Sequence, residues 1–239
     1  MTNNGQWNEK KTILVMLAHP DDPEFFLGGT IAQWSLSGHH VVYCLFTRGD
    51  KGANNPSLSP HDLAVIREKE QRSAAKVVGV EEITFLDYRD GELIPSLEAR
   101  KDVVRVIRRI RPQILVTCDP TNFYSRSNYL NHPDHRNAGQ IVLDAYFPAA
   151  GSPMFFPELL AEGLQPHSVE EIWISLAANP NTIIDVTSTW QTRLTALMEH
   201  KSQIGDPLAL EERMKNRRAA DSTEENPRYQ ESFLVLKFN

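Results

Sequence analysis

A chain of 239 residues, of which 41% are hydrophobic and 23% charged, is long enough to bury one large core or two small ones. Its net charge of −6 and the lack of a basic block disfavour a nucleic-acid partner, and the lack of an apolar run of about 20 residues disfavours a membrane-spanning segment. No change of composition divides the sequence, so we expect a single domain over residues 1–239.

Two features favour a reducing, cytoplasmic location. The N-terminal segment 1–11 is polar and lacks the apolar core of a signal peptide. The two cysteines, Cys44 and Cys118, lie inside predicted core strands and are expected to be reduced, buried thiols rather than a disulfide. Because no Cys-x-x-Cys pair occurs, a zinc ribbon is excluded.

The first predicted element is a strand over residues 12–18, a short apolar run typical of a strand buried on both faces of a parallel sheet. It leads to His19, Asp21 and Asp22, whose side chains bind metals or move protons. Ligands of open α/β sheets lie beyond the carboxyl ends of the strands, so a site is expected here. Asp22 precedes a proline, and the alternative is that it only caps the helix predicted over residues 24–37.

A second strand is predicted over residues 41–47. His39 and His40 precede it, at the edge of the sheet away from the site, and are interpreted as surface residues. The glycine-rich loop 47–52 follows the strand at the correct edge. This loop is either a flexible turn or a mobile wall of the pocket.

The next segments continue the alternation of helices and strands. A helix is predicted over residues 61–78, a short strand over 82–86, a turn over 87–93 and an amphipathic helix over 96–111. The last helix has a basic face, which we interpret as solvated or interfacial rather than as a nucleic-acid groove.

A second polar junction follows the apolar strand predicted over residues 114–118 and the long loop 119–131. His132, Asp134 and His135 stand there at the start of another predicted helix. Two His-Pro-Asp junctions, each after a buried strand, are hard to explain by packing alone and indicate a metal site. Imidazole and carboxylate groups both suit zinc.

The rest of the chain is less regular. The proline-containing segment 147–167 is expected to be a lid or specificity loop. The further elements expected are a helix over 133–147, strands over 171–177 and 182–186, helices over 190–202 and 211–220, and a strand over 232–238.

The repeated strand–helix order predicts an α/β fold that is Rossmann-like, with a mostly parallel sheet and helices on both faces. The G-x-G-x-x-G fingerprint is missing after the first strand, so a dinucleotide role is unsupported.

The motifs AHPDD at residues 18–22 and HPDH at residues 132–135 resemble the paired signatures of the LmbE-like, or PIG-L, zinc-dependent de-N-acetylases. The similarity extends from about Thr12 to Asp206. It implies a Rossmann-like fold and hydrolysis of an N-acetyl group, most often on an N-acetylglucosaminyl compound.

The resemblance also implies roles for five residues. His19, Asp22 and His135 would hold a catalytic zinc ion that keeps one position open for water. Asp21 would be the general base that accepts the proton of this water. His132 would stabilise the oxyanion of the tetrahedral intermediate or act as an acid.

Three further residues receive supporting roles. Asp134 would orient His132 and fix its protonation state. Arg67 matches a family arginine that contacts substrate, although by itself it would be assigned to a solvated helix face. Asp90 matches an aspartate that reaches a sugar hydroxyl, although an Asp-Gly tight turn explains it equally well.

The implied partner is a small N-acetylated amino-sugar, and family members often assemble as homo-oligomers, as trimers or hexamers. The alternatives are a zinc amidase that cleaves a larger acyl group or a thiol-sugar conjugate, a zinc-bearing binding protein without turnover, and a plain nucleotide binder. A His/Asp/His site also accommodates iron or cobalt.

Overall fold

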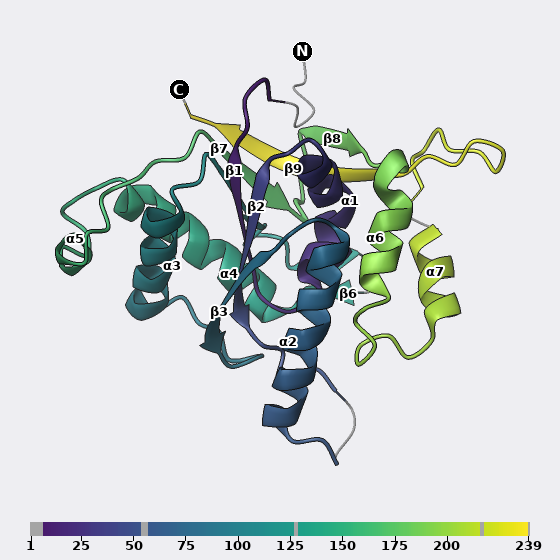
Figure 1. The fold of residues 1–239 in the computed structure, drawn as a ribbon, viewed down its shortest axis with the longest axis horizontal. Coiled ribbons are helices and arrows are strands. Elements are labelled where there is room, and N and C mark those ends of the chain that lie inside the picture. Colours follow the sequence, from purple (N-terminus) through teal and green to yellow (C-terminus); the bar gives the residue numbers. More distant parts are fainter. Residues whose placement is uncertain (1–6, 54–56, 127–128, 216–217, 239) are drawn as a thin grey trace.

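The computed structural model describes residues 7–53, 57–126, 129–215 and 218–238. Its main feature is a seven-stranded sheet with the order β3-β2-β1-β4-β7-β9-β8 (Figure 1). The strands of this sheet are β1 (Thr12–Leu17), β2 (His40–Thr47), β3 (Glu82–Tyr88), β4 (Ile114–Cys118), β7 (Glu171–Ser175), β8 (Thr182–Asp185) and β9 (Gln230–Lys237).

The strand directions confirm the predicted fold class. β1 pairs in parallel with β2 and β4, β2 with β3, and β4 with β7. Only β9 runs against its neighbours, β7 and β8. The sheet is therefore mostly parallel, and the carboxyl ends of β1 and β4 meet at one edge, where the two polar junctions follow.

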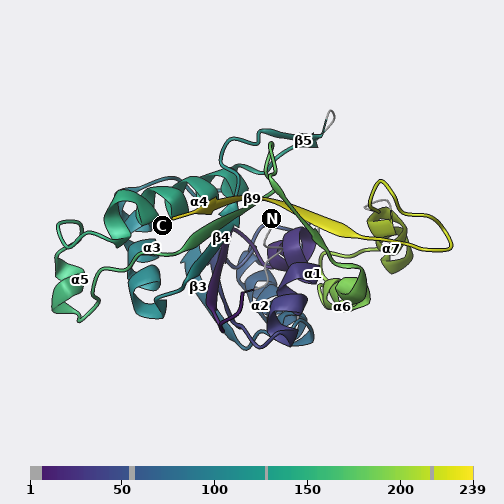
Figure 2. The same ribbon diagram turned by 90° about the horizontal axis from the view of Figure 1, so that it is seen from above.

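Helices cover both faces of the sheet, as Figure 2 shows from above, with α3 and α4 on one side and α1, α2 and α6 on the other. The helices are α1 (Asp22–Leu36), α2 (Pro60–Val77), α3 (Leu97–Ile110), α4 (Pro133–Asp144), α5 (Glu158–Ala161), α6 (Trp190–Leu197) and α7 (Pro207–Lys215). No helix within the described residues is long and apolar enough to cross a membrane.

The side chains of β1 alternate between two hydrophobic cores. Ile13 and Val15 point to the core under α1 and α6, whereas Leu14 and Met16 point to the core under α3 and α4. All four are fully buried. This two-sided burial explains the continuous apolar run in the sequence, because successive side chains of a strand face opposite sides.

Two of the helices begin at serine caps. The Ser59 side chain accepts a hydrogen bond from the Asp62 N–H at the start of α2, and Ser96 accepts one from the Ala99 N–H at the start of α3. Such caps satisfy N–H groups that have no partner inside a helix. α2, which carries Arg67, therefore has a defined beginning close to the site.

The structure corrects several boundaries. The loop predicted over residues 119–131 contains a small antiparallel hairpin of β5 (Tyr124–Arg126) and β6 (Tyr129–Leu130). The helix predicted to continue to residue 147 ends at Asp144 and passes into a π-helical turn, Ala145–Ala150. A short 3-10 turn, Thr187–Thr189, precedes α6, which ends at Leu197 rather than at residue 202.

His39 is the clearest correction outside the site. It was interpreted as a surface residue, but only 8% of it is exposed. Its Nδ1 atom accepts a hydrogen bond from the Lys11 N–H, and its ring packs edge-on against Trp7. His40 is exposed, as expected. Cys44 and Cys118 are both buried and free.

Candidate metal and catalytic centre

The two polar junctions come together at the carboxyl ends of β1 and β4. β1 ends at Leu17, and His19 follows after one further residue, Ala18. Asp22 begins α1, while His132 caps α4 by accepting a hydrogen bond from the Asp134 N–H. Asp21, rather than Asp22, is the N-cap residue of α1 and makes no capping bond with its side chain. The alternative that Asp22 only caps a helix is therefore wrong.

His19, Asp22 and His135 converge on one point. The His19 Nδ1 atom lies 3.3 Å from His135 Nε2 and 3.5 Å from Asp22 Oδ2, and His135 Nε2 lies 3.0 Å from Asp22 Oδ1. All three side chains are largely buried. These three residues form one of two groups in the described chain whose ligand atoms are close enough to share an ion.

The tautomers of His19 and His135 are set by hydrogen bonds of the ring nitrogens that face away from the point where the three side chains converge. The His135 Nδ1 atom lies 2.9 Å from Asn131 Oδ1, and the His19 Nε2 atom lies 3.1 Å from Asp134 Oδ2 and 3.2 Å from Asp90 Oδ1. Because these oxygens accept, the outer ring nitrogens donate and the inner nitrogens keep their lone pairs. Two lone pairs beside a carboxylate make a donor set that fits a divalent cation.

The charges around His19 favour a cation in the same way. Burial lowers the pKa of His19, but its hydrogen bonds to Asp134, Asp22 and Asp90 outweigh burial and raise the pKa well above its ordinary value. Burial raises the pKa of Asp22, yet the contacts with His135 and His19 hold it below its usual range. The carboxylates therefore favour a positive charge at His19. A proton on Nδ1 supplies this charge in the metal-free chain, and a metal ion that takes the place of this proton would supply it instead.

Asp90 belongs to the second possible ion-binding group, which consists of His19, Asp90, His132 and Asp134. Although burial opposes ionisation, the hydrogen bond from His19 lowers the pKa of Asp90 to about 2. Only 6% of Asp90 is exposed. The structure therefore places Asp90 inside the centre, in contact with His19.

Asp21, which directly precedes Asp22 in the chain, has an unusual backbone conformation. Its φ angle is 87°, in the left-handed region that residues with a side chain rarely adopt. Its carboxylate lies 3.2 Å from Arg67 Nη2. Burial raises the pKa of Asp21 to about 6, and the Arg67 charge limits the increase. Asp21 is thus a carboxylate whose proton affinity is suited to proton transfer near neutral pH.

Arg67 is buried beneath the glycine-rich loop rather than at the surface of α2. It donates hydrogen bonds to the carbonyl oxygens of Pro20 and Gly49 in addition to its contact with Asp21. A Cβ atom at Gly49 or Gly52 would lie only 2.2 or 2.3 Å from Arg67 Nη1, so a larger residue at either position would displace the Arg67 guanidinium. Gly49 also has a φ angle of 65°, which favours glycine. The prediction that Arg67 belongs to a solvated helix face is wrong.

The Asp134 carboxylate has different partners from the one expected, and Asp134 contacts His132 through its main-chain N–H instead. We expected Asp134 to orient His132, but its carboxylate accepts hydrogen bonds from the Gly91 and Leu93 N–H groups and contacts His19. Because His132 Nδ1 accepts from the Asp134 main chain, His132 Nε2 carries the proton. Burial lowers the pKa of His132, which favours this neutral donor form.

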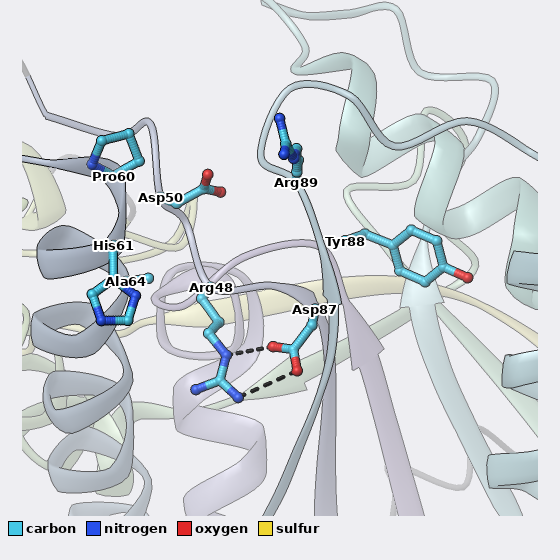
Figure 3. Close-up of a pocket in the computed structure, with 8 residues that line it drawn as sticks. All are labelled: Arg48, Asp50, Pro60, His61, Ala64, Asp87, Tyr88 and Arg89. Carbon is cyan, nitrogen blue, oxygen red and sulfur yellow. Dashed lines mark hydrogen bonds and ion pairs between the residues drawn. The ribbon is translucent and has the colours of Figure 1, made fainter.

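A pocket of about 170 Å³ lies next to the centre, between the start of α2 and the end of β3 (Figure 3). Arg48 and Asp87 pair on one side of it, and Asp50 and Arg89 lie across from them. The Asp50 carboxylate accepts a hydrogen bond from the Asp90 N–H at 2.9 Å, which links the pocket wall to the centre.

Sequence reasoning missed a buried network beneath Asp21. Gln71 and Glu24 are fully buried there, and His200 joins them from the chain that follows α6. Asn131 was also overlooked as the partner of His135. The signal for Glu24 was its position two residues after the first motif, but a polar residue in a helix that packs on a sheet is normally assigned to the solvent-exposed face.

Comparison with known proteins adds independent findings. Residues 14–146 match the family model described as "GlcNAc-PI de-N-acetylase", PIG-L. Diacetylchitobiose deacetylase of Thermococcus kodakarensis is 38% identical over 200 residues, which cover 84% of this chain and 73% of that protein. A probable N-acetyl-alpha-D-glucosaminyl L-malate deacetylase 2 of Bacillus anthracis is 26% identical, with 81% and 82% covered.

Solved structures agree with these sequence matches. The N,N'-diacetylchitobiose deacetylase of Pyrococcus horikoshii, determined with an inhibitor, superposes with a TM-score of 0.88 at 32% identity, over 99% of this chain and 87% of that one. The hydratase GalB of Pseudomonas putida superposes with a TM-score of 0.74 at 18% identity, over 96% and 97%. The latter likeness concerns the fold alone.

Proposed function

The chain belongs to the PIG-L family of de-N-acetylases, and on that basis we propose that it hydrolyses the N-acetyl group of a small N-acetylglucosaminyl-type substrate. The observation that carries the proposal is the convergence of His19, Asp22 and His135, next to which the chain carries a further carboxylate, Asp21, whose pKa is affected by the charges of Asp22 and His19. A site used only to bind an ion has no need of this additional base.

Zinc is the proposed metal, held by His19, Asp22 and His135, because two neutral imidazoles and one carboxylate leave a fourth position open. Such an ion supplies Lewis acidity, which lowers the pKa of a water molecule and polarises an amide carbonyl. Iron and cobalt suit the same donors, so metal analysis has to identify the ion.

The chain's own residues supply the proton transfers. Asp21, whose pKa burial raises to about 6, accepts the proton of the attacking water and returns it to the departing amine. His132 donates its Nε2 proton in a hydrogen bond to the oxyanion that forms on the substrate. Arg67 holds the Asp21 carboxylate in place through its contact at 3.2 Å.

Substrate recognition would use the polar groups that surround the metal and catalytic centre. Asp90 is proposed to accept a hydrogen bond from a sugar hydroxyl, as the family resemblance suggests. The charged side chains of the neighbouring pocket, among them Arg48, Asp50 and Arg89, suit the hydroxyl-rich remainder of such a molecule. A direct contact between Arg67 and substrate stays a prediction.

Organisation and environment are proposed from the sequence. We expect one domain over residues 1–239, a homo-oligomeric assembly as a trimer or hexamer, and a cytoplasmic location without nucleic-acid or membrane partners. The competing chemical candidate is an amidase that removes a larger acyl group, since the same groups would cleave that bond.

Metal analysis by mass spectrometry, coupled to an assay of acetate release, tests the proposal. We expect about one zinc per chain and acetate release from N-acetylglucosamine or its β-linked dimer, lost on chelation and restored by zinc. His135→Ala should lose the metal, whereas His40→Ala, an exposed control, should keep it. Zinc without acetate release would favour the amidase or the binding protein, and a chain that takes up no metal would refute the proposed centre.

A further inference from the structure

The main chain of Asp21 is held by a residue from a distant part of the sequence. Its N–H donates a hydrogen bond of 2.7 Å to Gln71 Oε1 on α2. Asp21 has φ 87° and ψ −28°, a conformation that persists only where the surroundings enforce it. The Gln71 bond is a direct contact that can do so, because it fixes the direction of the Asp21 N–H.

The orientation of the Gln71 amide follows from its other partner. Gln71 Nε2 lies 3.1 Å from both carboxylate oxygens of Glu24, and both side chains are fully buried. An ionised carboxylate only accepts hydrogen bonds, so the NH₂ end of Gln71 must face Glu24. The oxygen end then faces the Asp21 N–H, where an acceptor is needed.

Glu24 is itself fixed from several elements. His200 Nε2 lies 3.1 Å from Glu24 Oε2, and the Tyr43 hydroxyl donates to Oε1 at 3.3 Å. Arg193 donates to the main-chain oxygen of Glu24 at 2.9 Å. The chain of contacts therefore runs from β2 and the segment after α6, through Glu24 and Gln71, to the main chain of Asp21.

We propose that Gln71 is a positioning residue for the reaction, which holds the main chain of Asp21 in its left-handed conformation and so aims the Asp21 carboxylate, with Glu24 selecting the productive orientation of the Gln71 amide. The proposal rests on the proposed function, because it assumes that Asp21 is the base. Gln71 does not touch the substrate and acts only through Asp21.

Gln71→Met is the main test, since methionine keeps the approximate size of the side chain and removes its hydrogen bonds to Asp21 and Glu24. We expect kcat to fall about 10- to 100-fold, as expected for a displaced catalytic group, with KM and metal content unchanged. Gln113→Met is the matched control, because Gln113 Oε1 accepts from the Thr12 N–H at 2.8 Å at the opposite edge of the sheet. Its kcat should stay at the wild-type value.

Two further variants separate positioning from a general structural role. In an Asp21→Asn background, Gln71→Met should cause little further loss of kcat, because the group it aims is gone. Gln71→Glu keeps an acceptor for the Asp21 N–H but sets a second carboxylate against that of Glu24. The exchange of Gln71→Glu together with Glu24→Gln restores a donor between the two side chains and should recover most of the activity lost by Gln71→Glu alone. Equal losses in both backgrounds, or no recovery by the exchange, would overturn the proposal.

A crystal structure of Gln71→Met gives an answer independent of activity. We expect Asp21 to leave the left-handed region or to occupy more than one conformation. An unchanged φ angle would overturn the positioning role even if the enzyme were inactive. Conversely, a displaced Asp21 together with full turnover in Asp21→Asn would locate the failure in the assignment of the base.

Discussion

The Nδ1 atom of His135 lies 2.9 Å from the side-chain oxygen of Asn131, and this contact determines which nitrogen of His135 can bind a metal. The Asn131 NH₂ group donates to the Asn122 carbonyl oxygen at 2.8 Å, so the amide oxygen of Asn131 must face His135. His135 Nδ1 then carries the proton, and the lone pair of Nε2 faces Asp22 and His19.

Asn131→Ala should therefore weaken metal binding. Loss of the partner that sets the tautomer of a histidine ligand typically lowers affinity about 10- to 100-fold. Asn131→Asp, which keeps an acceptor for His135, should lose less. Titration of the metal-free protein with zinc, in competition with a chelating dye, measures the dissociation constants. Asn181→Ala is the control, because Asn181 also uses both ends of its amide but bonds to Val235 at the edge of the sheet.

Asp21→Asn should retain the metal and lose turnover. The amide keeps the size of the side chain but cannot accept a proton at neutral pH, and loss of a general base typically costs about 10²- to 10⁴-fold in rate. Acetate release per bound zinc measures the effect. Asp144→Asn, on α4 but paired with Arg100 away from the centre, is the control. Wild-type turnover in Asp21→Asn would show that another group is the base.

The local parts of the fold could be predicted because their signals are short-range. The run at residues 13–18 is apolar throughout because both of its faces are buried. The two junctions stand out because each comes after such a strand, the first at His19 and the second beyond the loop 119–131. The position of β9 inside the sheet could not be predicted in this way. β9 takes its place by pairing with β7 and β8, which are distant from it in the sequence. Such a pairing leaves no local pattern in the sequence of any of the three strands.

The difference between short-range sequence signals and tertiary contacts also applies to the metal and catalytic centre. His19, Asp22 and His135 were identified from their two motifs, and the structure places their ligand atoms together. Gln71 was missed, and Arg67 was named only through the family resemblance, because polar residues that face a buried network have the spacing of a solvated helix face. Gln71 and Arg67 lie in a charged stretch of α2, yet they are 0% and 4% exposed. Only the tertiary contact with Asp21 distinguishes them.

His39 should make the protein less stable in mild acid. Burial and the nearby Lys10 and Lys11 lower the pKa of His39, and its Nδ1 atom accepts a hydrogen bond that only the neutral ring can accept. The unfolded chain takes up the proton first, below about pH 6.5, so this contribution is present above that pH and is lost as the pH falls. The slope from this residue is at most about 1.4 kcal/mol per pH unit.

Urea unfolding at pH 7.5 and at pH 5.5 tests this prediction. His39→Asn keeps an oxygen that can accept from the Lys11 N–H but does not titrate in this range. We expect the free energy of unfolding to fall more between the two pH values in the wild type than in His39→Asn. Equal changes in the two proteins would show that His39 does not contribute to the acid sensitivity.

Glu231→Gln should destabilise the fold strongly. Glu231 Oε1 lies 2.9 Å from Arg193 Nη1, with 2% and 1% of the two side chains exposed, and its carboxylate accepts from the N–H groups of Gly29 and Thr30. Glu231 on β9 therefore connects this strand to Arg193 on α6 and to the main chain of α1. Removal of one member leaves the other charge buried and uncompensated, which typically costs about 3–5 kcal/mol.

Urea unfolding of Glu231→Gln measures this cost, and Glu211→Gln provides the control, because Glu211 pairs with Lys215 on an exposed face. The control should change the free energy of unfolding by less than about 1 kcal/mol. The double variant Arg193→Met/Glu231→Leu should be less destabilised than the sum of its single variants, since it removes both charges together. A small effect of Glu231→Gln would mean that Arg193 keeps a compensating partner in Glu24, whose main-chain oxygen it already binds.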